Sequence, residues 1–190
     1  TTQNNSFGPT EISYLENRFT NLAKETDRFI VKNGNEPNLG NVTEEKESEL
    51  EDFVEYSKMV LGVLGYKVFV PLLKSECNPK NEESEQRRLY LSRKIKRSNR
   101  TINAQCIYTS EGFVVLKGSM IEENDSKYIP NSIKALRARC QANGDIISGL
   151  LQKNYLFNSP SYAAAFVLGM NTNGKVDWKT NDGITLKNLD

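Results

Sequence analysis

Histidine is absent from all 190 residues of the chain, and this absence excludes several kinds of chemistry. A Ser-His-Asp triad, a Cys-His dyad and any metal site with a histidine ligand cannot be built from these residues. Most zinc nucleases and zinc deaminases depend on clusters of histidine and cysteine. The sequence therefore excludes these enzyme classes for this chain by itself.

Cysteine is also scarce, with only Cys77, Cys106 and Cys140 present and no Cys-x-x-Cys pair among them. This odd number and wide spacing argue against a disulfide framework and against a structural zinc site. Long apolar runs are missing as well. The longest, residues 59–73, contains Lys67 and Pro71 and is shorter than the ~20 apolar residues of a spanning helix. With no signal-peptide pattern, we expect a cytoplasmic protein without a membrane partner.

Charge is balanced overall but unevenly distributed along the chain. The net charge is +1, yet residues 1–73 hold 12 acids and 7 bases, whereas residues 74–190 hold 12 acids and 18 bases. This asymmetry predicts two units, of which the second is better suited to an anionic partner. The alternative is that the two halves neutralise each other.

Residues 1–73 have the pattern of a helical unit. Ile12, Leu15, Phe19 and Leu22 recur at helical spacing and predict one helix from Thr10 to about residue 27. A second, acidic helix begins after Thr43 and ends at Gly65. Its expected apolar face consists of Leu50, Phe53, Val54, Val60, Leu61 and Leu64. Short extended segments are predicted at residues 29–31 and 66–70.

Residues 74–86 are polar and are predicted to be a linker, and residues 87–190 have the pattern of a second unit. Alternating segments predict strands at residues 89–95, 102–108 and 113–121, with further extended segments at 155–157, 176–178 and 184–186. Helices are expected after Ser132 and after Ser159-Pro160. The fold class is therefore predicted to be α+β, with a helical N-terminal unit and a small antiparallel sheet packed with two helices.

A basic segment at the start of the second unit is the strongest candidate for binding nucleic acid. Residues 86–100 contain seven cations and no acid. The candidate phosphate contacts are Arg93, Lys94, Lys96, Arg97 and Arg100, extended by Lys117 and Ser119 at the end of a later strand. Residues 117–119 lack the glycine spacing of a P-loop, so no nucleotide cofactor is expected. The alternative is a solvated strand edge that its charges keep soluble.

Trp178, the single tryptophan, has two interpretations. Its large apolar surface can anchor a small core. Its ring can instead stack on a nucleic-acid base, together with Tyr162. We favour the core role.

Two stretches resemble known families. Residues 6–70 contain TEISYLENRFTNLAKETDRF, then VKNGNEPN and a helix ending in VLGY, and resemble the end of the nuclease domain of bacterial GIY-YIG proteins. The resemblance implies that Glu16 binds a divalent metal such as Mg²⁺ in a complete parent protein, with Asn33 or Asn35 completing the site. The Gly-Ile-Tyr and Tyr-Ile-Gly motifs and the family's arginine are missing, and Glu11 stands where relatives often have histidine. The chain thus looks like a nuclease domain without its front half.

Residues 87–190 carry the second resemblance. They contain FVVLKGSMI, SIKALRARC, YLFNSPSYAAAFVLGMNTNGKVDWK and GITL, in that order. This pattern is similar to a small domain of unknown function that follows GIY-YIG domains and occurs in restriction-modification proteins, and its last third resembles the RAMA module. The resemblance implies that DNA is a partner of this unit.

Three functional hypotheses follow. The first is a DNA-associated accessory region that is not catalytic by itself and needs no cofactor. The second is a protein-interaction module that uses the acidic helix of residues 44–64. The third is part of an active metal-dependent endonuclease whose front half lies outside this sequence.

Overall fold

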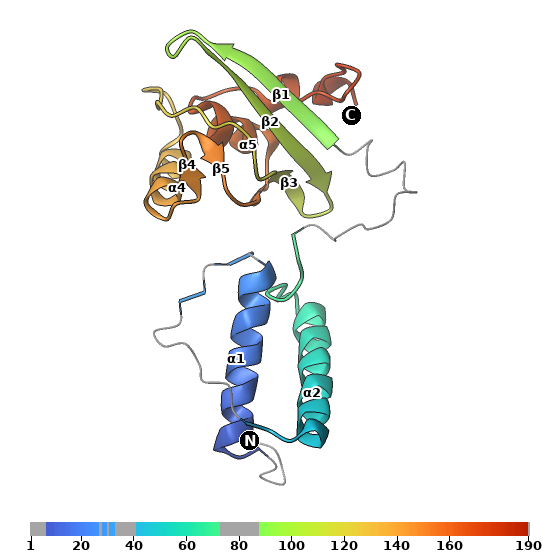
Figure 1. Cartoon of the computed structure of the whole chain (residues 1–190). Coiled ribbons are helices and arrows are strands. Elements are labelled where there is room, and N and C mark those ends of the chain that lie inside the picture. The colour runs from blue at the N-terminus through green and yellow to red at the C-terminus, as the bar shows by residue number, and fades with distance from the viewer. Residues whose placement is uncertain (1–6, 27, 30, 33–40, 73–87, 190) are drawn as a thin grey trace. The chain divides into compact units, whose positions relative to one another are not determined.

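The computed structural model describes residues 7–26, 28–29, 31–32, 41–72 and 88–189. The chain divides into two compact units, Thr1–Ser75 and Glu76–Asp190, which are described separately below (Figure 1). The first unit contains helices, and the second combines an antiparallel sheet with helices. This architecture confirms the predicted α+β class. The predicted linker, residues 74–86, lies outside the described residues.

The first unit is a pair of packed helices, α1 (Pro9–Thr26) and α2 (Glu44–Val63). Both helices were predicted. Tyr14 and Leu15 of α1 pack against Leu50 and Val54 of α2 to form its core. The predicted apolar face of α1 was partly wrong, because Ile12 is 56% exposed while Tyr14 is buried.

A polar cluster joins the two helices beside this core. The Tyr14 hydroxyl donates hydrogen bonds to Glu51 Oε1 at 2.9 Å and to Glu47 Oε1 at 3.1 Å. The Arg18 guanidinium donates to both carboxylate oxygens of Glu51, at 2.7 and 3.1 Å. The hydrogen bond from Arg18 is the main cause that lowers the pKa of Glu51, and the hydrogen bond from Tyr14 lowers it further. Burial is the main cause that raises the pKa of Tyr14, and the two carboxylates raise it further.

The chain turns sharply at the end of α2, as Gly65 predicted. Gly65 has a φ of +85°. Its N–H donates to the Gly62 carbonyl at 3.1 Å, and the Tyr66 N–H donates to the Leu61 carbonyl at 2.8 Å. These two bonds form a Schellman motif.

The strand predicted at residues 66–70 is wrong, because this segment consists of turns. Its carbonyls are used by side chains near the end of α1 instead of by a neighbouring strand. The Thr26 hydroxyl donates to the Val68 carbonyl at 2.9 Å, and Arg28 Nε donates to the Val70 carbonyl at 2.8 Å. Residues 28–29 form a bend, and residue 30 of the predicted extended segment 29–31 lies outside the described residues.

The second unit is built on a four-stranded antiparallel sheet of order β1-β2-β3-β6. Its strands are β1 (Arg88–Ile95), β2 (Arg100–Thr109), β3 (Gly112–Val115) and β6 (Tyr155–Phe157). The third predicted strand ends at Val115, earlier than expected. A separate short hairpin, β4 (Ile146–Ile147) and β5 (Leu150–Leu151), was not predicted.

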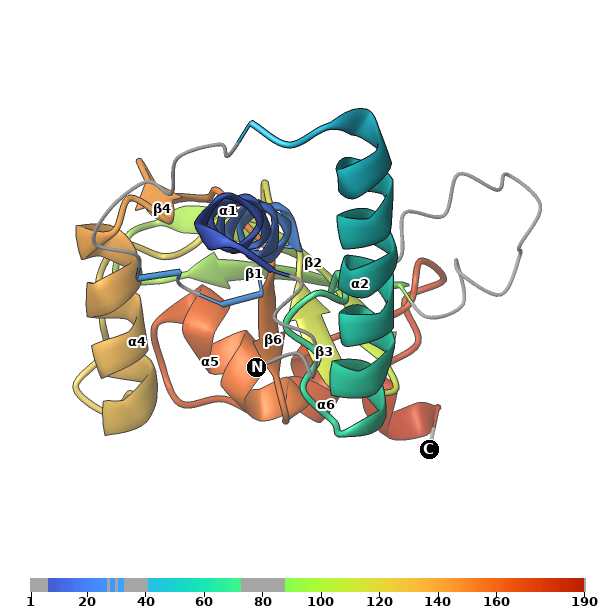
Figure 2. The same cartoon turned by 90° about the horizontal axis from the view of Figure 1, so that it is seen from below.

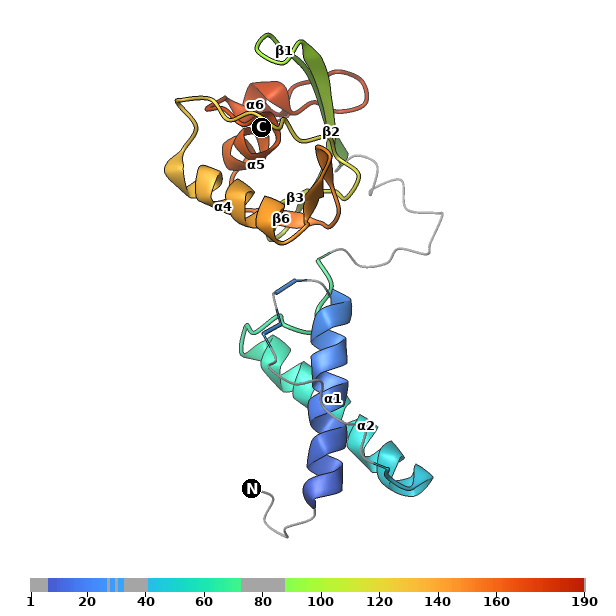
Figure 3. The ribbon, with the colours of Figure 1, turned by 60° about the vertical axis from the view of Figure 1, so that its left-hand side comes forward.

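Helices α4 (Asn131–Ala142), α5 (Pro160–Leu168) and the short α6 (Gly174–Asp177) complete the unit, with a 3₁₀ turn at Leu186–Asn188. Helix α5 lies between α4 and α6 (Figures 2 and 3). Residues 163–168 of α5 are all buried, so this helix is the centre of the core. Ser159 caps it by accepting from the Ser161 N–H at 3.2 Å, as predicted.

Residues 178–186 close the unit against β1. Trp178 is fully buried, and its indole N–H donates to the Pro160 carbonyl at 3.0 Å. Lys179 exchanges backbone hydrogen bonds of 2.7 and 2.9 Å with Tyr90 on β1. The extended segment predicted at residues 176–178 is wrong in its first part, because Asn173 caps the helical turn α6 there.

Candidate nucleic-acid interface

The β1–β2 ribbon, defined as residues 88–109, separates its side chains by strand alternation. Leu89, Leu91 and Ile95 of β1 face the core, as do Ile102 and Ala104 of β2. The opposite, outer face carries a different and mostly polar set. Its members are Arg88, Tyr90, Ser92 and Lys94 from β1, and Thr101, Asn103, Gln105 and the half-buried Ile107 from β2. No aspartate or glutamate occurs anywhere in the ribbon.

Lys94 and Lys96 are exposed cations of this ribbon, as are Arg97 and Arg100, but the two arginines make contacts within the protein. Lys94 pairs in register with Thr101 on the outer face, and Lys96 lies in the connecting turn. Neither lysine has an ion-pair partner within the described part of the chain. Arg88 contributes a third cation at the other end of the face, where it donates to the Gln105 amide oxygen at 3.4 Å.

Arg93 and Arg97 were predicted to belong to the same set, but both make contacts within the protein. Arg93 Nη1 pairs with Asp177 at 3.1 Å and donates to the Thr172 hydroxyl at 2.8 Å. Arg97 Nη2 donates to the Leu168 carbonyl at 2.9 Å, at the end of α5. These two guanidiniums therefore join the ribbon to α6 and α5.

The remaining predicted contacts do not gather into one patch. Ser119 is buried, where its hydroxyl accepts from the Gln105 N–H at 3.1 Å. Lys117 is exposed in a turn after β3, and Arg87 lies outside the described residues. Arg100 is exposed and pairs loosely with Glu123 at 3.7 Å.

Trp178 and Tyr162 are not equivalent candidates for base stacking. Trp178 is completely buried, which supports the core role that we favour. Tyr162, in the first turn of α5, is 46% exposed. Only Tyr162 presents its ring to solvent.

Glu16, the residue implied as a metal ligand, is exposed on α1. Asn33 and Asn35 lie outside the described residues. Among the residues that the structure describes, no three His, Cys, Asp or Glu side chains gather in a group that could hold a metal ion. Because a hard cation such as Mg²⁺ needs several oxygen ligands, the described surroundings of Glu16 do not fit one.

The two described cysteines of the second unit offer no reactive thiol. Cys106 and Cys140 are both completely buried. Burial raises the pKa of each thiol, so the nucleophilic thiolate is disfavoured.

Sequence reasoning missed a buried polar cluster around Arg137, which is only 1% exposed. Arg137 Nε donates to Asp125 Oδ1 at 2.7 Å. Its other two nitrogens donate to the carbonyls of Phe166 and Glu122. The signal was present in the spacing, because Arg137 follows Ile133 by four residues and precedes Cys140 by three, which places it on the same buried face of α4.

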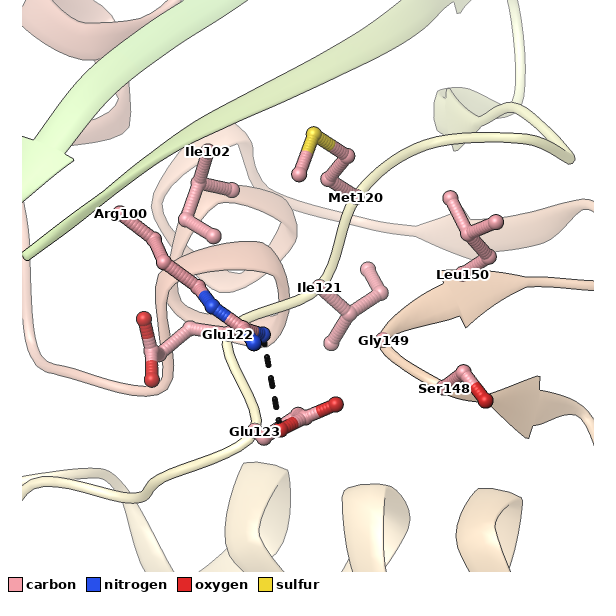
Figure 4. A pocket seen from close by; sticks show the side chains of 9 residues that line it. All are labelled: Arg100, Ile102, Met120, Ile121, Glu122, Glu123, Ser148, Gly149 and Leu150. Carbon is pink, nitrogen blue, oxygen red and sulfur yellow. Dashed lines mark ion pairs between the residues drawn. The ribbon is translucent and has the colours of Figure 1, made fainter. Parts of the chain in front are cut away.

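A small pocket of about 230 Å³ was also missed (Figure 4). Ile102, Met120, Ile121 and Leu150 supply aliphatic walls, and the Arg100–Glu123 pair lies at one side. Glu122, which also lines it, already accepts from the Ser98 hydroxyl at 2.6 Å and from the Asn124 N–H at 3.1 Å. The pocket therefore has a chiefly apolar character.

Comparison with known proteins gives one family. The sequence profile described as Domain of unknown function (DUF4357) matches residues 94–190. The chain belongs to this family. The DUF4357 match covers the last two residues of β1, the complete β2, α4, α5 and α6, and Trp178, and it agrees with the domain of unknown function expected for residues 87–190.

The comparisons do not extend beyond the DUF4357 region. No curated protein and no solved structure matches the chain. In the described ranges, no helix has the length and apolar character needed to cross a membrane.

Proposed function

We propose that the DUF4357 unit binds duplex DNA through the outer face of its β1–β2 ribbon, as a non-catalytic accessory region of a DNA-processing protein. The observation that carries this proposal is the pair of exposed lysines, Lys94 and Lys96, on a ribbon without a single acid. A charge cluster without internal partners is suited to an anionic surface.

The shape of the ribbon supports a duplex as the partner. At the turn end of the ribbon, where Lys94 pairs with Thr101, no further strand is paired to β1 or β2 in the described residues, and a two-stranded antiparallel ribbon is narrow enough to enter the major groove of DNA. Lys94 and Lys96 then contact phosphates, which fix position without reading sequence. Asn103 and Gln105 stand on the same face, and their amides are suited to contact base edges.

Fluorescence anisotropy with a labelled DNA duplex tests the proposal. The informative variant reverses Lys94 and Lys96 to Glu, because both side chains are exposed and make no side-chain hydrogen bond or ion pair with the residues that the structure describes. We expect weaker binding to all sequences and a log–log salt slope that is shallower by about 1.8 if each lysine neutralises one phosphate. Reversing Arg93 or Arg97 is less informative, because it also breaks contacts to α6 or α5.

The matched control reverses Lys134 and Arg139, two exposed cations of α4, and changes the net charge by the same amount. Binding that falls equally in both double variants would show only a general effect of net charge. Binding that is undetectable at low salt would overturn the proposal.

The role of the parent protein is proposed from the resemblance to GIY-YIG nucleases. We expect no DNA cleavage by this chain with Mg²⁺ or Mn²⁺, because it lacks the family's tyrosines and arginine. Incubation with supercoiled plasmid checks this expectation. Nicking that is abolished by Glu16→Gln would support the endonuclease hypothesis instead.

A second function, docking of another protein chain, is favoured by one observation on α2. The acidic half of this helix is followed by exposed apolar side chains, among them Tyr56 at 71% and Val63 at 84% exposure. Exposed apolar groups that cluster are typical of an interaction surface. Substitutions on α2 should then impair docking without affecting the salt dependence of DNA binding.

A further inference from the structure

Residues 53–64, from the middle of α2 to its C-cap, carry an apolar surface that the described first unit leaves largely exposed. We call it the α2 stripe. Its members and their exposed fractions are Phe53 41%, Tyr56 71%, Met59 66%, Val60 53%, Val63 84% and Leu64 65%. Leu50 and Val54, by contrast, are fully buried against α1. Helix α2 is therefore apolar on a second face beside the one that packs on α1.

The spacing within the α2 stripe is that of a helix–helix seam. Phe53, Tyr56, Val60 and Val63 follow one another at intervals of three, four and three residues. This is the a/d pattern of helices that pack side by side with a shallow crossing angle. Phe53 touches the Phe7 ring at its edge, with centroids 5.3 Å apart, and the rest of the seam continues toward the end of the helix.

Charge is segregated along α2 in a way that restricts the partner. All seven acids of the helix lie in residues 44–55. Between residues 56 and 64 the single charge is Lys58, which pairs with Glu55 at 2.8 Å. A strongly basic partner would find no carboxylate along the α2 stripe beyond Glu55, so a neutral apolar surface fits it best.

We propose that the partner is a second copy of this chain, bound antiparallel along the α2 stripe about a twofold axis. When the two helices cross between residues 56 and 60, Phe53 lies opposite Val63 of the other copy and Tyr56 lies opposite its Val60. Each large ring then meets a small β-branched side chain, which allows close packing. A twofold interface of this kind is self-complementary.

The acidic half of α2 decides the orientation. A parallel pair would place residues 44–55 of both copies side by side and bring fourteen carboxylates together, seven from each helix. The antiparallel pair sends the two acidic halves to opposite ends and also opposes the helix dipoles favourably. The α2 stripe alone then forms the contact.

Sedimentation velocity of the full chain over a range of concentrations tests the proposal. We expect a dimer that becomes monomeric in the double variant Val60→Glu with Val63→Glu, which buries like charges at the centre of the seam. The matched control, Asn21→Glu with Ser48→Glu, adds the same charge at exposed positions of the first unit away from the seam and should remain dimeric. Circular dichroism checks that both variants keep their helices.

Cysteine cross-linking tests the orientation, in a Cys77→Ser background because Cys106 and Cys140 are buried. A mixture of Tyr56→Cys and Val60→Cys chains should form the mixed disulfide under mild oxidation. Cross-linking of Tyr56→Cys only with itself would overturn the antiparallel arrangement. A dimer that survives Val60→Glu with Val63→Glu would overturn the seam.

This inference rests on the docking function proposed for α2 and is independent of DNA binding. A chain that stays monomeric at all concentrations would overturn the second copy as partner. Docking of a different protein would then be the remaining function of the α2 stripe, and the same double variant, Val60→Glu with Val63→Glu, tests it directly.

Discussion

Arginine and lysine have different roles in the basic segment, although they alternate within a few residues. Arg93 and Arg97 hold a carboxylate and a helix carbonyl, whereas Lys94 and Lys96 point to solvent. A planar guanidinium keeps several donors in fixed directions and suits contacts within a fold better than a flexible ammonium does. Charge counting along the sequence therefore overestimates the number of cations that are free to bind a partner.

Arg137 should be the most sensitive single charged position of the second unit. Replacing it with Met leaves Asp125 without its partner and the carbonyls of Phe166 and Glu122 without their donors. We expect a loss of about 3–5 kcal/mol in the free energy of unfolding. Urea unfolding followed by the fluorescence of Trp178 measures it, with Arg139→Ala on the exposed side of α4 as the control. Equal stability of the two variants would contradict this role.

Glu51 should make the first unit sensitive to acid. Its pKa is lowered in the folded state, chiefly by the hydrogen bond from Arg18, so its contribution is present above the unfolded pKa of about 4.3 and is lost as the pH falls through the folded value. We expect Glu51→Gln to cost about 0.5–1 kcal/mol at pH 7, because the pair is one-third exposed, and much less at pH 3.

Thermal unfolding at both pH values, followed by circular dichroism, checks this difference. Glu49→Gln is the control, because Glu49 is more exposed and pairs with its helix neighbour Lys46 instead of bridging the two helices. A stability gap between wild type and Glu51→Gln that stays constant from pH 7 to pH 3 would refute the role of the ionised carboxylate.

At the scale of elements, local signals predicted the helices well. Thr43 marks the start of α2 and Gly65 marks its end, and Ser159 with Pro160 marks the start of α5. These signals are readable from the sequence because caps and turns depend on only a few neighbouring residues. The strands β1 and β2 were also predicted, since their alternation continues over 8 and 10 residues. Boundaries of these elements shifted by only one or two positions.

Elements that depend on distant partners were not predictable. Residues 66–70 alternate like a strand, but Thr26 and Arg28 take up their carbonyls and no strand lies beside them in the described residues. Helix α6 requires Gly174 to pack against α5, where an added Cβ would lie 2.1 Å from the Pro160 carbonyl oxygen. Neither contact can be inferred from spacing along the chain.

The same distinction applies to the candidate interface. The basic ribbon could be located from the sequence, but only the strand register and the position of α6 distinguish the exposed Lys94 from Arg93, which pairs with Asp177. A one-residue shift in register would exchange the two faces. Phe53, Val60 and Leu64 of the α2 stripe were predicted to belong to the buried face of this helix, and this was wrong, because all three are exposed. Periodicity shows an apolar face without showing what covers it.

Gly62, in the last turn of α2, and Gly65, just after its C-cap, should respond oppositely to substitution by Ala. Gly62 is helical with nothing within 4 Å of an added Cβ, so Gly62→Ala should stabilise the first unit by about 0.5–1 kcal/mol. Gly65 has a φ of +85°, so Gly65→Ala should destabilise it by about 1–2 kcal/mol. Thermal unfolding of both variants provides the comparison, and a shift in the same direction for both would contradict the Schellman ending of α2.

At the scale of the whole molecule, the two units have separate cores. The core of the second unit, centred on α5, draws all its members from residues 89–186. We therefore predict that a fragment of residues 88–190 folds by itself. Its amide NMR spectrum should be dispersed and should retain most shifts of the full chain. A collapsed, undispersed spectrum would show that the fragment depends on the first unit.

The closure of β1 by Lys179 has a consequence during synthesis. Tyr90 and its partner Lys179 are 89 positions apart, and the Trp178 ring fills the core only when it arrives with that segment. A ribosome adds about 5–20 residues per second, so roughly 5–20 s pass between the synthesis of the two strands. In that interval the edge of β1 is a template for any other extended chain. Neighbouring nascent chains on one polysome supply such segments, so dense translation of a single message should favour mispairing at β1.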